Sequence, residues 1–237
     1  MSATTPKIQR TIAIIPARGG SKGIPKKNLA LIDGVPLVAY TIRAALGVDR
    51  IEDVLVSTDD EEIAAVALKE GASVIRRPEE LARDDSPTEP CVLHAMEKWE
   101  ETEGVLLDWV VLLQPTAPLR DSTDIANAFK ILEKSGADCI LSVMERREFH
   151  WEREGDFGVA QWDIDHRPRR QELRPDLIEN GAIYISRADL YRKRGNRLGG
   201  KIALYEMPLE RSIDVDEPFD LWLVESTLRY KKQSGEG

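Results

Sequence analysis

The sequence lacks an excess of basic residues, since 33 Lys and Arg against 42 Asp and Glu give a formal net charge of −9. So acidic a chain is not expected to bind nucleic acid or an anionic membrane surface, because both are polyanions. No apolar run is long enough to span a bilayer, and the start, MSATTPKIQR, has no apolar segment typical of a secretory signal. We therefore expect a cytoplasmic protein without membrane or nucleic-acid partners.

Cysteine and histidine are also scarce, with two and three residues respectively. Cys91 and Cys139 stand in apolar surroundings without the spacing of metal ligands, so we expect buried, reduced thiols. His94 and His166 stand alone in the sequence and are interpreted as surface or packing residues. A length of 237 residues with 42% hydrophobic content is enough for one substantial core, and we expect a single domain over residues 1–237.

Short β-branched runs alternate with amphipathic stretches along most of the chain. This alternation predicts an α/β fold, a doubly wound and mainly parallel sheet with helices on both faces. The expected strands cover residues 11–15, 54–58, 73–77, 109–114, 139–145 and 182–186. The expected helices lie near residues 36–46, 60–70, 87–100, 122–135 and 218–230.

Residues 149–174 break this alternation. They have no helical period, and two aromatic-containing pieces around Gly155 and Gly158 predict a β-hairpin that projects from the main sheet. An isolated hairpin is only marginally stable in water. We therefore expect the aromatic side chains of this arm to pack on a second subunit. They are Phe149, Trp151, Phe157 and Trp162.

The segment PARGGSKGIPKKN, residues 16–28, follows the first expected strand and concentrates positive charge in an acidic chain. It holds three glycines and four cations, and residues 1–32 contain no acid at all. Ligands of doubly wound sheets bind at the carboxyl ends of the strands, and glycines let backbone N–H groups approach a phosphate closely. The segment matches neither a P-loop nor a dinucleotide fingerprint. It predicts a site for a small polyanion, the alternative being a solvated basic turn.

A second pattern, SIDVDEP, places Asp214 and Asp216 two residues apart in an extended segment. Their side chains then point to the same side, where two hard carboxylate oxygens can face one cation. A magnesium ion there would remove the repulsion between the two carboxylates and a bound phosphate. The alternative is that the pair caps the helix expected to begin near Pro218.

Seven blocks together resemble the acylneuraminate cytidylyltransferases, also called CMP-sialic acid synthetases. In chain order they are IPARGGSKGIPKKN, GVPLVAYTIRAAL, VLVSTDDEEIA, RRPEELARDDSPT, LLQPTAPLR, NGAIYIS and SIDVDEPFDL. The match as a whole runs from about residue 11 to about residue 225. The resemblance implies a Rossmann-like nucleotidyltransferase fold with a dimerisation arm at residues 149–174. It also implies transfer of CMP from CTP to the anomeric hydroxyl of a nonulosonic (sialic-type) acid, with release of pyrophosphate. The expected cofactor is Mg²⁺, with Mn²⁺ as a substitute, and the expected assembly is a homodimer.

The same resemblance assigns residues to the nucleotide and to catalysis. The implied nucleotide contacts are Ala17, Arg18, Gly19, Ser21, Lys22, Lys27, Asn28, Arg77, Asp85 and Ser86. The implied catalytic residues are Arg18, Lys27, Asp214 and Asp216, the last two as metal ligands. Ser86 is equally well read as the N-cap of a helix whose first residue is Pro87.

The implied sugar contacts are Gln114, Thr116, Arg170, Gln171 and Tyr184. An Arg suits the substrate carboxylate, because its planar fork binds two oxygens at once. Arg120, in the same block as Gln114, has the alternative of pairing with Asp121 or Asp124. The arm departs from the family where a Lys is often seen, since residues 150–153 read HWER, so the acceptor acid stays open.

Two other functions are weighed against this one. A 3-deoxy-manno-octulosonate cytidylyltransferase would run the same chemistry on an eight-carbon acid. Those enzymes typically carry a QGDEP-like block where this chain has LLQPTAPLR, which disfavours that assignment. A non-catalytic nucleotide-binding module could keep the basic segment, but it would have little reason to keep Asp214, Asp216 and Arg170 together.

Overall fold

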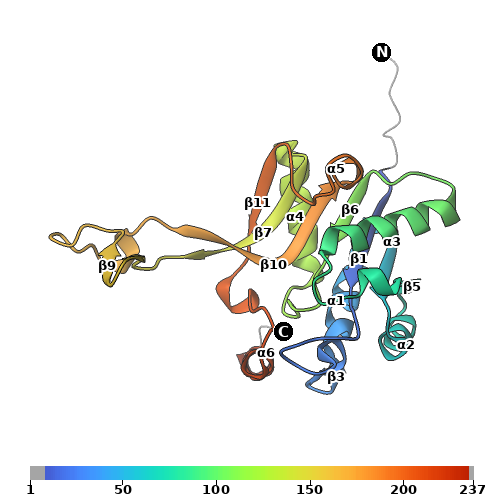
Figure 1. Cartoon of the computed structure of the whole chain (residues 1–237), viewed down its shortest axis with the longest axis horizontal. Coiled ribbons are helices and arrows are strands. Elements are labelled where there is room, and N and C mark those ends of the chain that lie inside the picture. The colour runs from blue at the N-terminus through green and yellow to red at the C-terminus, as the bar shows by residue number, and fades with distance from the viewer. Residues whose placement is uncertain (1–8, 235–237) are drawn as a thin grey trace, which may run out of the picture.

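A seven-stranded sheet forms the centre of the protein in a computed structural model, which describes residues 9–234 (Figure 1). The expected cytoplasmic location rests partly on the sequence of residues 1–10, of which residues 1–8 lie outside the described residues. The strands follow the order β11-β7-β10-β6-β1-β4-β5 across the sheet. Their bounds are β1 Thr11–Pro16, β4 Asp53–Thr58, β5 Ser73–Arg76, β6 Trp109–Leu112, β7 Cys139–Arg146, β10 Asp176–Arg187 and β11 Ile202–Glu206.

Six of these strands run parallel and β10 alone runs the other way, antiparallel to both of its neighbours, β6 and β7. The carboxyl ends of β1, β4 and β6 therefore meet at one edge of the sheet, which is where doubly wound folds bind their ligands. The predicted α/β class and mainly parallel sheet are confirmed. The strands β11 and the two-residue hairpin β2 Leu31–Ile32 and β3 Val35–Pro36 were not predicted.

Helices cover both faces of the sheet. Ile12 and Ile14 of β1 pack with α3 and α5 on one face, whereas Ala13 and Ile15 pack with α1, α2 and α4 on the other. This division follows from the two-residue period of a strand, which points successive side chains to opposite faces. Because both faces of the sheet are covered by helices, the sequence of the strand is a continuous apolar run. The helix bounds are α1 Leu37–Leu46, α2 Glu61–Lys69, α3 Thr88–Glu103, α4 Ser122–Ser135 and α5 Ala188–Arg194.

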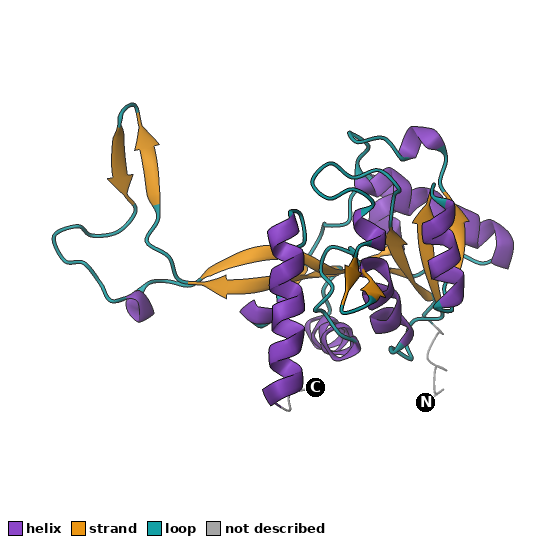
Figure 2. Ribbon diagram, turned by 90° about the horizontal axis from the view of Figure 1, so that it is seen from below, coloured by secondary structure: helices purple, strands orange, loops and turns teal. Residues whose placement is uncertain are grey.

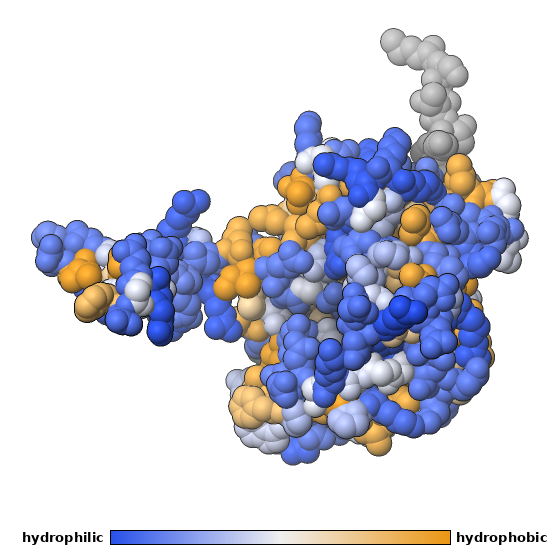
Figure 3. Space-filling model, in the orientation of Figure 1, coloured by the Kyte–Doolittle hydropathy of each residue, from blue (hydrophilic) through white to orange (hydrophobic). Residues whose placement is uncertain are grey.

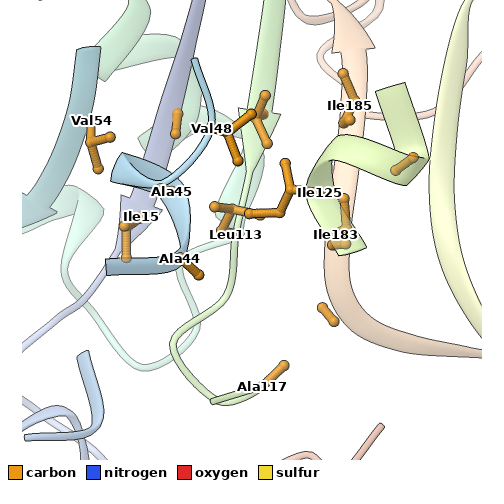
Figure 4. Packing of buried hydrophobic residues seen from close by; sticks show 14 of the residues in the cluster. Ile15, Ala44, Ala45, Val48, Val54, Leu113, Ala117, Ile125, Ile183 and Ile185 are labelled. Atoms are coloured by element: carbon orange, nitrogen blue, oxygen red, sulfur yellow. The ribbon is translucent and has the colours of Figure 1, made fainter. Parts of the chain in front are cut away.

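Figure 4 shows the larger of these clusters at close range. Ile15, Leu113 and Ile183 come from three neighbouring strands or their ends and point toward α1 and α4. All three side chains are fully buried. The packing fixes the ends of β1 and β6, and with them the loops that follow.

The last helix, α6 Pro218–Ser234, packs away from the sheet against the β2-β3 hairpin and the start of α1. Val215 and Val224 contribute to a third apolar cluster together with Ile24 of the basic segment. Segments that are almost 200 residues apart along the chain are thereby brought side by side. Within residues 9–234, no helix is both long and apolar enough to cross a membrane.

The arm leaves the body as a two-stranded ribbon, seen from two directions in Figures 1 and 2. The ribbon continues β7 and β10, from the pair Glu179 and Val143 out to the pair Asp176 and Arg146. The predicted hairpin is present beyond it, as β8 Trp151–Glu154 and β9 Phe157–Ala160. The arm thus projects as expected, and its ribbon base begins inside the body of the sheet.

The aromatic residues of the arm pack on one another more than expected. Trp162 meets Phe149 at 5.1 Å and Trp151 at 5.8 Å between ring centroids, both edge-on. The guanidinium of Arg167 lies 4.0 Å from the centroid of Phe149. Phe149 and Trp162 are thus half-buried within their own chain, whereas Trp151 stays 57% exposed, and packing of the arm on a second subunit stays a prediction. Phe157, 79% exposed, still has its apolar surface in water, and Figure 3 shows apolar side chains at the arm.

The scarce residue types lie as predicted. Cys91 and Cys139 are free thiols with exposed fractions of 1% and 0%. His94 is partly buried on α3, and His166 is exposed beside Asp163. None of the four residues is part of a metal-ligand cluster among residues 9–234.

Candidate active site

A cleft of about 670 Å³ lies at the carboxyl ends of β1, β5 and β6. Its walls come from the basic segment, from residues 77–91, from the end of β6 and from the segment before α6. It brings together most residues predicted for the nucleotide, the metal and part of the sugar site. These are Arg18, Ser21, Lys22, Lys27, Asn28, Arg77, Ser86, Gln114, Thr116, Asp214 and Asp216.

The basic segment folds back on itself through its own polar side chains. The amide of Asn28, which is buried, donates to the backbone oxygen of Arg18 at 2.9 Å. The hydroxyl of Ser21 donates to the carbonyl of Ile24 and accepts from the backbone N–H of Lys27 at 3.2 Å. Neighbouring Ala17 is buried and continues the β1 ladder by donating to Ser57 O. The loop is thus shaped before any ligand arrives, which lowers the entropic cost of binding.

Two glycines of this segment permit close contacts with other segments. A Cβ on Gly23 would clash with the backbone oxygen of Asp216, so the basic segment and the segment before α6 touch there. A Cβ on Gly19 would lie 2.7 Å from the carboxylate of Asp60, and the Gly19 N–H donates to Asp59. Larger side chains at these positions would move the loop.

The cations of the segment take different directions. The Lys27 ammonium donates to Val215 O at 2.9 Å and to Asp216 Oδ1 at 3.0 Å, with its side chain only 16% exposed. Arg18 lies 3.1 Å from the carboxylate of Asp84, which Lys22 also approaches at 3.5 Å. Lys26, by contrast, pairs with Glu62 of α2. Three cations therefore face the cleft and one faces a helix.

Two carboxylates face these cations from the opposite wall. Solvent reaches Asp214, but partial desolvation raises its pKa, and the charge of Asp216 acts in the same direction. A hydrogen bond with Thr116 opposes the shift. The helix α6 is capped by Asp220, whose carboxylate accepts from the backbone of Asp216 and Glu217. The alternative that Asp214 and Asp216 cap this helix is therefore wrong.

The donor set of the cleft fits a magnesium ion that also takes water and phosphate oxygens. Carboxylate oxygens are the ligands that this hard cation prefers, and Asp214 and Asp216 supply them at one end of the cleft. Among residues 9–234, no group of three or more His, Cys, Asp and Glu side chains is arranged to hold a metal. Mg²⁺ usually keeps several waters and takes substrate phosphate oxygens, so two protein carboxylates are a sufficient protein share.

The wall formed by residues 77–91 differs in detail from the prediction. Arg77 lines the cleft and donates to Ser57 O at 2.6 Å. Ser86 also lines it, but α3 begins at Thr88 and the Ser86 hydroxyl donates to Glu80 O, so the N-cap alternative is wrong. Asp85 is exposed and lies outside the cleft lining, where its neighbour Asp84 takes part instead.

Gln114 and Thr116 line the cleft just past the end of β6, as predicted. Arg120 is 1% exposed and donates to Gln114 O, Ala182 O and the hydroxyl of Thr41. Burial lowers the pKa of Arg120 to about 10. The expected pairing of Arg120 with Asp121 or Asp124 is wrong, because both carboxylates pair with Arg211 at 2.7 Å.

Three residues predicted for the sugar lie outside this cleft. Tyr184 is buried, its hydroxyl donates to Glu179, and burial raises its pKa. Arg170 donates to Arg147 O at 2.8 Å and pairs with Glu148 at 2.6 Å at the base of the arm. Gln171 lies beside it in a separate shallow pocket. The structure therefore divides the predicted sugar site between the cleft and the arm.

Sequence reasoning missed several residues of the cleft, among them Gly23, Asp84 and Glu217. Gly23 was visible as a glycine in the basic segment, but its contact with Asp216 depends on the tertiary fold. Asp84 and Asp85 are adjacent acids, and nothing in the sequence pattern chooses between them. No sequence signal identified Glu217.

The family was identified by comparison with known proteins. A sequence model described as Cytidylyltransferase matches residues 12–211, most of the chain. The chain belongs to the cytidylyltransferase family. It is 37% identical over 227 residues to the N-acylneuraminate cytidylyltransferase A of Danio rerio, a match that covers 92% of this chain and 51% of the relative. It is 35% identical over 229 residues to the N-acylneuraminate cytidylyltransferase of Escherichia coli, which covers 94% of this chain and 53% of that protein.

The chain spans about half the length of the curated relatives it matches. Among solved structures, a CMP:2-keto-3-deoxy-manno-octonic acid synthetase complexed with CTP superimposes with a TM-score of 0.68 at 20% identity, covering 94% of this chain and all of that one. That likeness establishes the nucleotidyltransferase fold of this cytidylyltransferase.

Proposed function

We propose that this cytidylyltransferase transfers CMP from CTP to the anomeric hydroxyl of a nonulosonic (sialic-type) acid and releases pyrophosphate. The observation that carries the proposal is the cleft itself, in which Arg18, Lys22 and Lys27 face Asp214 and Asp216. Relatives named for N-acylneuraminate, matched over about nine tenths of this chain, support the choice of acceptor.

The cations act on the triphosphate. Pyrophosphate leaves as the acceptor hydroxyl attacks the α-phosphorus in line, so negative charge grows on the departing oxygens. Lys27 is held in place by Val215 O and Asp216, and Arg18 by Arg83 O, before the substrate binds. Preorganised cations of this kind stabilise the transition state without paying for reorganisation.

A magnesium ion, with manganese as a substitute, would be held by Asp214 and Asp216. When bound, such an ion neutralises phosphate charge and makes a nearby hydroxyl more acidic. In the structure the Lys27 ammonium pairs with Asp216. A cation bound to Asp216 would replace this ion pair, and the ammonium, still held by Val215 O, could then donate to phosphate oxygens.

The acceptor acid would be bound by Gln114 and Thr116 of the cleft and by residues of the arm. Arg170 and Gln171 lie outside the cleft of their own chain, which supports a homodimer in which one arm closes over the partner's cleft. Arg170 would then bind the acid's carboxylate. Tyr184, which is buried and lies outside the cleft lining, would support the sugar site indirectly. The cytoplasmic location of the protein stays a prediction.

A second candidate is transfer of CMP to the eight-carbon 2-keto-3-deoxy-manno-octonic acid. Its support is the fold of the synthetase for that acid, which this chain shares at a TM-score of 0.68. The two candidates share the nucleotide chemistry and differ only in the acceptor.

Pyrophosphate release decides between them. The protein, CTP and Mg²⁺ would be incubated with a series of nonulosonic acids and with 2-keto-3-deoxy-manno-octonic acid, after a thermal-shift test of CTP with and without Mg²⁺. We expect turnover with a nine-carbon acid and little with the eight-carbon acid. Release with the eight-carbon acid alone would support the second candidate, and binding of CTP without turnover of any acid would support a non-catalytic module.

A further inference from the structure

The wall behind Gln114 is formed by a bulge in β10 that no ladder pairing explains. Glu179 pairs with Val143 and Tyr184 with Leu141, so β10 takes five steps where β7 takes two. Between these pairs, Asn180 accepts from the N–H of Ala182, and the hydroxyl of Ser142 accepts from the N–H of Ile183. Side chains therefore satisfy the backbone groups that the bulge takes out of the ladder.

Gly181, at the crest of this bulge, lies against the side chain of Gln114. Its φ is +70°, a left-handed conformation that glycine adopts without steric cost. A Cβ at this position would lie 2.7 Å from Oε1 of Gln114 and 3.7 Å from Cδ. The space that glycine leaves empty is thus the space into which the carboxamide fits.

Arg120 ties the same two segments together from below. Nε donates to Ala182 O at 3.3 Å, next to Gly181, and one terminal nitrogen donates to Gln114 O at 3.2 Å. That nitrogen also donates to the hydroxyl of Thr41 on α1 at 2.9 Å. The side chain is 1% exposed, and its other terminal nitrogen has no partner among the described residues.

A buried guanidinium without a paired carboxylate lowers the free energy of unfolding, because the charge is removed from water without an opposite charge beside it. Arg120 is therefore not explained by a contribution to stability. Its carbonyl acceptors belong to the residue that carries the carboxamide and to the bulge against which the carboxamide rests. An apolar side chain would leave these carbonyls without donors. Arg120 therefore sets the distance between the end of β6 and the bulge of β10.

We propose that Gly181 and Arg120 are positioning residues that fix the carboxamide of Gln114 against the β10 bulge, and so determine how the acceptor acid is bound. The inference deepens the proposed function and rests on it for the identity of the acceptor. Gly181 and Arg120 lie outside the cleft lining, whereas Gln114 is part of it. Their effect on the reaction is exerted through Gln114.

The first test replaces Gly181 with alanine and uses Gly136→Ala as its matched control. Gly136 has a φ of +61° and open space around it, so an alanine there meets only the backbone cost of the left-handed conformation. Both variants should lose a similar amount of thermal stability. In Gly181→Ala the methyl group also displaces the end of a flexible side chain. We expect kcat/KM for the acceptor acid to fall about tenfold or more, with the Kd for CTP within about twofold of wild type.

A double-mutant cycle separates positioning from general damage. In a Gln114→Ala background the carboxamide is gone, so adding Gly181→Ala should cause no further loss of kcat/KM. Arg120→Lys, which keeps the charge but lacks the planar fork that joins the two carbonyls, should show the same non-additivity. Independent, multiplicative losses from Gly181→Ala and Gln114→Ala would overturn the proposal.

A readout that needs no turnover distinguishes this inference from the proposed function. The side-chain amide resonances of Gln114, assigned by their loss in Gln114→Ala, should shift in Gly181→Ala and stay in place in Gly136→Ala. If wild type turned over no acid, the proposed function would fail while this measurement still tested the contact. Unshifted resonances in Gly181→Ala would overturn the positioning role.

Discussion

At the scale of single residues, two adjacent lysines illustrate how the backbone sorts charge. Lys26 adopts a left-handed conformation with φ of +51°, which is uncommon for a residue with a side chain. This turn sends Lys26 toward Glu62 of α2 and leaves Lys27 facing Asp216 across the cleft. Two residues of identical chemistry therefore have different environments. Composition alone does not distinguish the lysine that faces the cleft from the one that faces α2.

Lys27→Ala should abolish turnover while the fold stays intact. The lost ammonium opposes charge that moves onto pyrophosphate, and removing one preorganised contact of this kind costs on the order of 10²-fold or more in kcat. Arg18→Ala should behave alike. Lys26→Ala is the matched control, because its ammonium lies against α2, and it should stay within about threefold of wild type. Equal losses in Lys26→Ala and Lys27→Ala, measured by pyrophosphate release, would contradict the assignment.

The two cleft carboxylates belong to the same scale. Asp214→Asn and Asp216→Asn should each raise the Mg²⁺ concentration needed for half-maximal activity, because a neutral amide attracts the cation less. Loss of a residue that only supports a metal ligand typically weakens metal binding roughly tenfold or more. Loss of a ligand should therefore raise the required Mg²⁺ concentration at least as much. Glu210→Gln, an exposed change outside the cleft, serves as the control. Full activity of wild type in EDTA would refute the metal site.

At the scale of elements, the sequence predicted most of the sheet, because buried strands and amphipathic helices leave strong periodic patterns. It missed the seven-residue helix α5, the edge strand β11, and the two-residue strands β2 and β3. It also placed the start of β10 near Ala182, since the bulge at Gly181 interrupts the apolar run and hides the ribbon that precedes it. Local sequence patterns do not show which strand pairs with which, so the ribbon formed by β7 and β10 was not predicted.

The candidate site was predictable where a motif carries its chemistry in consecutive residues, as in the basic segment and in the Asp214 and Asp216 pair. It was not predictable where chemistry depends on distant segments meeting. The contact between Gly23 and Asp216 arises only because α6 folds back on the β2-β3 hairpin. Arg120 is a similar case, since its acceptors come from α1, from the segment after β6 and from β10.

Gly23→Ala tests the contact between these two segments. The new methyl group would clash with the backbone oxygen of Asp216, and a backbone atom cannot move aside as the end of a side chain can. We expect the carboxylates to move away from Lys27 and kcat to fall about 10²-fold, because small displacements in a reacting site have large effects. Gly104→Ala, whose Cβ meets open space at the end of α3 and outside the cleft lining, should lose far less. Comparable rates for both variants would show that the contact has no role in the reaction.

At the scale of the whole molecule, the arm is the part that a single chain does not explain. Figure 2 shows it extended well away from the body, and Phe157 and Trp151 on it are 79% and 57% exposed. Its own aromatic cluster stabilises the hairpin but leaves these surfaces in water. A second copy related by a two-fold axis would cover the same patch on both subunits at once. We therefore expect a dimer by light scattering at assay concentration, and a monomer would refute the shared pocket.

A mixture of two inactive variants tests whether Arg170 acts on the partner's cleft. Lys27→Ala damages the cleft, and Arg170→Ala damages the arm, whereas Arg169→Ala, which removes a neighbouring cation paired with Glu172, should stay active as the control. If the pocket is shared, a hybrid dimer of the two inactive variants has one pocket with both residues intact. Random exchange in an equal mixture makes half of the dimers hybrids, so about a quarter of wild-type activity should return. No recovery after exchange has been demonstrated by mass spectrometry would place Arg170 in the site of its own chain, and the arm would then have to fold toward its own cleft.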